Sequence, residues 1–194
     1  MSLPAAFRPF AEREAEATAL RTFEHSFIPG LLQTADYARA SVTTGFPDAP
    51  DQEVQRRVEL RLARQHILDR PDPPRLWLVI DEAALRRAAA GTGPEATRAQ
   101  LDKLIDHAGR PNVTIQVLPF AAGLHPAMYG PFRMFRFDTH HQPDIVYGES
   151  LTSAYYVDKP DETAAYAQAL DRISAQAAPG ADTVKILRDI RKET

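Results

Sequence analysis

The chain has 194 residues, of which 44% are hydrophobic and 25% are charged, as in folded globular proteins and unlike disordered ones. Its formal net charge of -3 lacks the basic excess of a protein that wraps nucleic acid, and without cysteine it can form neither disulfides nor cysteine-based zinc sites. No apolar run reaches the ~20 residues of a membrane span, and the first residues lack the pattern of a signal peptide.

The first section of the chain, about residues 10–70, is predicted to be helical. Three helices are expected there: Phe10–Phe23, from Thr34 to about Gly45, and Gln52–Asp69. Thr34 and Asp51 have side chains that suit the N-caps of the second and third helices. Pro29-Gly30 breaks the chain between the first two, so this section is a series of short helices.

The middle section, about residues 75–158, is predicted to form a mixed sheet of about five strands. The strands are expected at Leu76–Ile80, Val113–Leu118, 132–137, 144–149 and 152–157. Asp81 is predicted to cap a short helix after the first strand, and Pro94 to start a longer one before the second. This order predicts that the first two strands are adjacent and parallel.

Two helices, about 161–177 and 182–192, are expected to close the chain in a section of about residues 160–192. We therefore predict one domain over residues 1–194, of the α/β or α+β class, with helices packed on the sheet.

The third predicted helix has arginines on its apolar face. At about 100° per residue, an apolar stripe runs from Val54 to Leu68. Four polar residues lie within or beside this stripe: Arg57, Arg61, Arg64 and Gln65.

Two interpretations of these arginines stay open. They could cover apolar surface and pair with internal carboxylates, for which Asp81, Glu82 and Glu149 stand at predicted strand ends. They could instead line a pocket for an anionic ligand or for an acidic segment of a partner. In either case, we predict that at least two of the three arginines are substantially buried, with a carboxylate, a backbone carbonyl or an open pocket in front of each.

An enzymatic function is the alternative to a binding function. Glu149 with His125 could act as an acid–base pair, and Asp81 follows a strand, where α/β proteins often bind ligands. These residues would support a hydrolase-like enzyme.

Neither a metal nor a cofactor is expected. His125, His140 and His141 stand in loop-like segments, and their spacing matches no known ligand motif. Adjacent residues of an extended segment point to opposite sides, so His140 and His141 would rarely bind one ion together.

Several segments resemble a known family. "LRTFEHSFIPGLLQTADYARA", "RVELRLARQHIL", "NVTIQVLP" and "GPFRMFRF" look like segments of an actinobacterial domain of unknown function. That domain typically follows an Xre-type helix-turn-helix domain in streptomycete-like transcriptional regulators. The resemblance covers about Glu14 to Ile190.

The resemblance implies a cytoplasmic regulatory domain without catalytic residues, which binds a small molecule, a small partner protein, or both. No helix-turn-helix fits before residue 10, so we expect DNA contact only through a domain outside this chain. Whether the chain forms a homodimer stays open. The candidates for ligand or partner contact are Gln33, Tyr37, Arg39, Arg57, Arg61, Arg64, Gln65 and Glu149.

Overall fold

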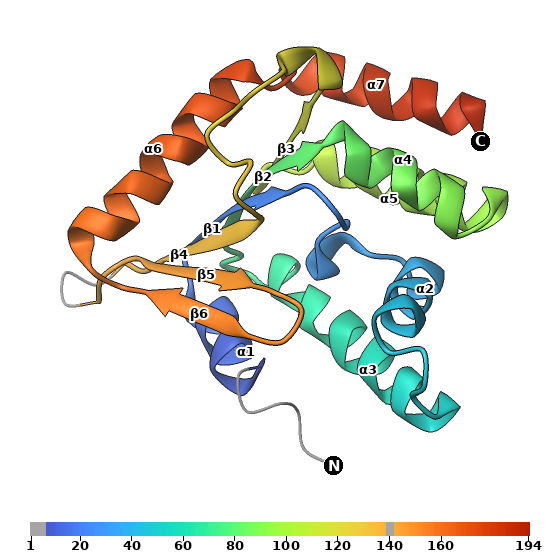
Figure 1. The fold of residues 1–194 in the computed structure, drawn as a ribbon, viewed down its shortest axis with the longest axis horizontal. Helices are drawn as coiled ribbons and strands as arrows, with labels where there is room; N and C mark the ends of the chain where they lie inside the picture. Colours follow the sequence, from blue (N-terminus) through green and yellow to red (C-terminus); the bar gives the residue numbers. More distant parts are fainter. Residues whose placement is uncertain (1–6, 139–141) are drawn as a thin grey trace.

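A six-stranded mixed sheet forms the centre of the computed structural model, which describes residues 7–138 and 142–194 (Figure 1). The strands are β1 (Ala19–Glu24), β2 (Arg75–Asp81), β3 (Val113–Leu118), β4 (Phe132–Arg136), β5 (Ile145–Glu149) and β6 (Ala154–Val157). Their order is β3-β2-β1-β4-β5-β6, in which β1, β2 and β3 are parallel and the other pairings are antiparallel. The predicted adjacent, parallel strands at Leu76–Ile80 and Val113–Leu118 are thus confirmed.

The first predicted helix is wrong in its second half. Helix α1 (Phe7–Glu16) ends early, and β1 follows it. Within β1, Leu20 and Thr22 face one side of the sheet, and Arg21 and Phe23 the other. Because β1 pairs with β2 on one edge and β4 on the other, these long-range hydrogen bonds outweigh the helical tendency of the preceding Ala- and Glu-rich residues. The sheet therefore has six strands where about five were predicted.

The remaining helices follow the predicted pattern closely. They are α2 (Ala35–Gly45), α3 (Asp51–Ala63), α4 (Glu82–Gly91), α5 (Pro94–Ala108), α6 (Pro160–Gln176) and α7 (Gly180–Glu193), with short 3-10 helices η1 (Gly30–Leu32), η2 (Arg64–Leu68) and η3 (Phe120–Ala122). The Thr34 hydroxyl accepts the Tyr37 N–H at 3.3 Å, and the Asp81 carboxylate accepts the Ala83 N–H at 2.7 Å. The N-caps predicted at Thr34 and Asp81 are thus confirmed.

The third predicted helix needs two corrections. Pro50, rather than Asp51, occupies the N-cap, and Asp51 is the first helical residue, where its charge complements the helix dipole. The regular α-helix ends at Ala63, and the chain continues as the 3-10 helix η2 from Arg64. The tighter winding of η2 changes the directions of Arg64 and Gln65 relative to those on a continuous helix.

Helices cover both faces of the sheet, as Figure 1 shows, with α6 on one side and α1 on the other. On the α6 face, Phe23 and Met134 belong to a buried apolar cluster with Leu170 and Ile173 of α6. On the opposite face, residues such as Leu20 join a larger core with α1, α4, α5, α7 and η1. Helices α2 and α3 pack against each other through a small apolar cluster of their own.

Local contacts stabilise the sheet near its two edge strands, β3 and β6. The linker between α6 and α7 covers the edge of β3, since the Ala178 N–H donates to the Val117 carbonyl at 2.8 Å. On β5, Gly148 leaves room for the Tyr155 ring of β6, because a Cβ atom at residue 148 would lie 2.1 Å from Tyr155 Cζ. Among the described residues, no helix is long and apolar enough to cross a membrane.

Candidate functional site

A cluster of charged side chains lies on the sheet face opposite α6, between the sheet and the α1, η2 and α3 helices. Glu14 of α1 is at its centre and is only 1% exposed. Its carboxylate accepts hydrogen bonds from Arg64 at 2.7 Å and from Arg133 of β4 at 2.5 Å. Both guanidinium groups also lie over the Phe10 ring. This pairing compensates the buried charges inside the protein, so Arg64 fits the interpretation of an internally paired arginine.

Arg61 has a different environment, because its hydrogen-bond partners are neutral. Its Nη1 donates to the Gln33 amide oxygen at 2.9 Å and to the Ser41 hydroxyl at 3.2 Å. Its aliphatic stem covers Gly30, where a Cβ atom would lie 3.3 Å from Arg61 Cγ. Burial lowers the pKa of Arg61, and the charge of Arg64 lowers it further. No carboxylate within the described residues is hydrogen-bonded to Arg61. Among Arg57, Arg61 and Arg64, the charge of Arg61 is therefore the least compensated.

The segment from Phe27 to Ala40 forms one wall beside Arg61. The Ile28 N–H donates to the Tyr37 hydroxyl at 3.1 Å, and the Gln33 amide donates to the Ile28 carbonyl at 2.6 Å. The Gln65 amide donates to the carbonyls of Gly30 and Gln33, both at 2.8 Å. Gln33, Tyr37 and Gln65 therefore fix the corner at Pro29-Gly30, and their polar groups are largely used within the fold.

Two of the candidate arginines lie away from this cluster. Arg57 pairs with Glu53 one helical turn earlier at 2.7 Å and lies over the Phe46 ring. Arg39 is exposed and donates to Gln55. The carboxylate partners of Arg57 and Arg64 are thus Glu53 and Glu14, which corrects the expectation that Asp81, Glu82 or Glu149 would serve. The Glu14 partner was not evident from the sequence because Glu14 and Arg64 meet only through the tertiary fold, whereas Glu53 lies four residues before Arg57 on the same helix.

Glu24, at the end of β1, is a titratable residue that the sequence analysis missed. Its carboxyl group has no hydrogen bond within residues 7–138 and 142–194. Burial raises its pKa from 4.5 to about 7; the charge of Arg133 partly opposes this, and Glu149 adds to it. Glu149 itself is exposed and accepts a hydrogen bond from the Tyr147 hydroxyl at 3.1 Å. Glu24 therefore exchanges its proton near neutral pH.

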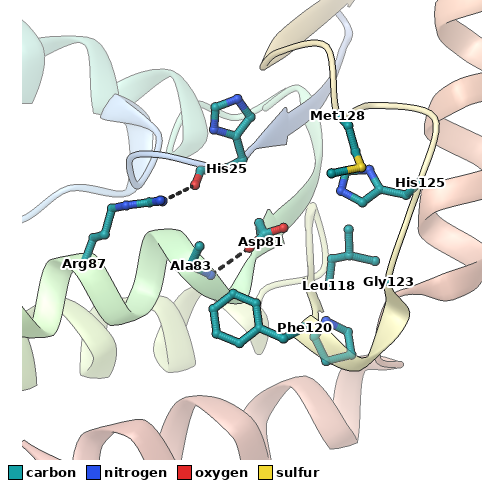
Figure 2. Close-up of a pocket in the computed structure, with 10 residues that line it drawn as sticks. His25, Asp81, Ala83, Arg87, Leu118, Phe120, Gly123, His125 and Met128 are labelled. Carbon is teal, nitrogen blue, oxygen red and sulfur yellow. Dashed lines mark hydrogen bonds between the residues drawn. The ribbon is translucent and has the colours of Figure 1, made fainter.

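A cavity of about 350 Å³ lies at the carboxyl ends of β1, β2 and β3 (Figure 2). Its lining comes from these strand ends, from the first turns of α4 and from the loop between β3 and β4. The lining residues are His25, Asp81, Ala83, Arg87, Leu118, Pro119, Phe120, Gly123, His125 and Met128. The carboxyl edge of parallel strands is the usual position for ligands in open α/β sheets.

The polar groups of the cavity are held by a few contacts. Arg87 donates to the His25 carbonyl at 3.0 Å, and the His25 ring nitrogen Nδ1 lies 2.6 Å from the Ser26 hydroxyl. One oxygen of Asp81 caps α4, as described above. Figure 2 shows Asp81 in the middle of the lining, with Arg87 and His25 on one side and His125 on the other.

His125 is held as a neutral ring. It packs edge-on against Phe23 with the ring centroids 5.3 Å apart, and its Nδ1 is buried with no hydrogen-bond partner among the described residues. Burial lowers the pKa of His125, and the charge of Asp81 opposes this only in part. His125 and Asp81, both singled out from the sequence, thus share one cavity, whereas Glu149 does not line it.

The side chains that line the cavity include an aspartate, two histidines and an arginine. The same lining contains no Ser, Thr, Cys or Lys. Within the described part of the chain, no three His, Asp or Glu side chains are grouped closely enough to hold a metal ion. His140 and His141, which the sequence analysis also considered, lie outside the described residues.

His25 and Arg87 were also missed from the sequence. His25 follows β1, which had been predicted as helix, so its place at a strand end was hidden. Arg87 lies one turn and a half after the Asp81 cap, on the face of α4 that looks into the cavity. The rule that drew attention to Asp81, that ligands bind beside the carboxyl ends of strands, would have led to His25 had β1 been recognised, whereas Arg87 lies within α4 and not at a strand end.

The comparisons with known proteins give one match. A family model described as Domain of unknown function (DUF5753) matches residues 7–189. The search of curated proteins found no match, and neither did the search of solved structures.

Proposed function

The chain belongs to the family of the DUF5753 domain, and we propose that it is a non-catalytic regulatory domain that binds a small molecule. The observation that carries this proposal is the cavity at the carboxyl ends of β1, β2 and β3. It combines an apolar wall with a few charged and polar groups, as small-molecule sites usually do.

The regulatory part of the proposal rests on the resemblance of the sequence to domains that follow a helix-turn-helix. In this proposal the ligand changes how a separate DNA-binding domain, or a small partner protein, engages its target in the cytoplasm. The net charge of -3 supports the proposal that a separate domain binds DNA and that this chain does not.

Filling the cavity tests the proposal. Ala83 lies in the first turn of α4 and lines the cavity, so Ala83→Trp should occupy the space that a ligand needs. Ala90 is exposed on the same helix and does not line the cavity, so Ala90→Trp is the matched control. Each protein is incubated with a small-molecule extract of the organism that encodes it and is then examined by native mass spectrometry.

We expect the unchanged protein and Ala90→Trp to retain a small molecule at a one-to-one ratio, and Ala83→Trp to lose it. The proposal fails if the unchanged protein retains nothing, or if Ala83→Trp retains the same molecule equally well. Thermal melts of all three proteins show whether the cavity variant is still folded.

A further inference from the structure

Two opposite charges in the cavity have unused hydrogen-bonding capacity. Asp81 uses one carboxylate oxygen to accept the Ala83 N–H, and its other oxygen has no hydrogen bond among the described residues. Arg87 uses Nη1 to hold the His25 carbonyl, and its remaining N–H groups have no such partner in the same part of the chain. No hydrogen bond joins Asp81 to Arg87, so both are available to a ligand.

His125 and Glu82 do not add a further charge to the cavity lining near neutral pH. The lowered pKa of His125 keeps its ring neutral near neutral pH. Glu82, the next acidic residue, does not line the cavity, and its carboxylate accepts hydrogen bonds from Arg86 at 2.7 Å and from the Phe120 N–H at 3.1 Å. The cavity thus offers one carboxylate and one guanidinium group.

A simple anion fits the cavity poorly. The amino end of α4 would attract an anion, but Asp81 already occupies that position and accepts the Ala83 N–H. The charge of Asp81 would repel a second negative group placed beside it. In the same way, the positive charge of Arg87 would repel a simple cation bound beside it.

Apolar side chains form the rest of the wall. Leu118 is buried, whereas Phe120 and Met128 are 58% and 57% exposed. Large apolar side chains exposed beside a cavity are typical of a surface that a ligand covers.

We propose that the cavity binds a small zwitterion of the amino-acid type. Its ammonium group donates to the free oxygen of Asp81, its carboxylate accepts from Arg87, and its apolar side chain packs against Phe120 and Met128. A volume of about 350 Å³ is at the lower end of small-molecule sites and suits a ligand of this size. This inference rests on the proposed function, since it names the class of ligand for the same cavity.

Calorimetric titration with the common amino acids, one at a time, tests the inference directly. For an amino acid that binds, two truncated analogues follow: the amine without the carboxylate and the acid without the ammonium group. We expect each analogue to bind about tenfold more weakly or worse, because each loses one charge-assisted hydrogen bond.

Three variants assign the two charges. Asp81→Asn keeps an oxygen that can cap α4 but loses the negative charge, and Arg87→Gln keeps an N–H donor but loses the positive charge. Both should weaken binding of the zwitterion by about tenfold or more. Arg86→Gln should leave binding unchanged, because Arg86 is paired with Glu82 and Glu193 outside the cavity lining.

The possible results separate this inference from the proposed function. If no amino acid binds while the extract still yields a molecule that Ala83→Trp excludes, the zwitterion is wrong and the binding function stands. Equal affinity for an amino acid and either truncated analogue also overturns the inference. If neither the extract nor the amino acids give a bound molecule, both proposals fail.

Discussion

Replacing Glu24 by glutamine should stabilise the protein at neutral and higher pH but not in mild acid. Burial raises the pKa of the Glu24 carboxyl group from 4.5 to about 7. Between these values the folded chain holds a proton that the unfolded chain has lost, so the free energy of unfolding falls as the pH rises. Glutamine resembles the neutral acid and has no charge to bury, so Glu24→Gln removes this penalty.

The size of the effect follows from the same two pKa values. A rise from 4.5 to about 7 corresponds to about 3 kcal/mol between the two protonation states. The full difference is present only above about pH 7, and it vanishes below about pH 4.5. For a chain of this length, about 3 kcal/mol corresponds to a rise in Tm of about 6–12 °C.

Thermal melts followed by circular dichroism at about pH 8 and about pH 4.5 measure the effect. Glu12→Gln is the control, since Glu12 is exposed on α1 and its replacement should change Tm little at either pH. A Glu24→Gln protein whose Tm is unchanged or lower at the higher pH would show that the ionised carboxylate is not penalised in the fold.

Four further outcomes are expected. Glu14→Gln should lower the free energy of unfolding by about 3–5 kcal/mol in urea denaturation, because it removes the carboxylate that pairs with Arg64 and Arg133. The control is Glu16→Gln, at an exposed residue, which should change the free energy of unfolding by less than about 0.5 kcal/mol. Arg61→Ala should cost only about 1–2 kcal/mol in the same assay, because its partners are neutral; a loss equal to that of Glu14→Gln would contradict this. Gly148→Ala should lower stability by about 1–3 kcal/mol by displacing the Tyr155 ring, and an unchanged melt would mean that the ring moves freely. Gel shifts at about 0.15 M salt should show no sequence-dependent binding of duplex DNA by this chain alone.

Short-range patterns predicted much of the fold. The caps at Thr34 and Asp81 were readable because each depends on one side chain and a backbone N–H two or three residues on. The parallel pair β2–β3 was readable because an apolar run and an alternating run flank two helical patterns. The strand β1 could not be predicted from local patterns, because the strands that pair with it begin more than 50 residues later in the chain.

In the candidate site, too, features that depend on local patterns were predicted, and those that depend on tertiary contacts were not. Periodicity placed Arg61 and Arg64 on an inward face, and the structure brings both against buried partners. Which partner each would take depended on contacts across the fold, and α1 supplied Glu14 where a strand-end acid had been expected. Asp81 and His125 meet at the cavity because the sheet order places β2 beside β1 and the loop before β4 over their ends.

The central position of β1 has a consequence for synthesis on the ribosome. β1 emerges early and can pair with β2, which in turn pairs with β3, but the other edge of β1 stays unpaired until β4 has been made. At about 5–20 residues per second, the stretch from Leu118 to Arg136 takes about 1–4 s to translate. During that interval a nascent chain offers an open strand edge with Phe23 beside it, which is the kind of surface that promotes aggregation and that chaperones shield.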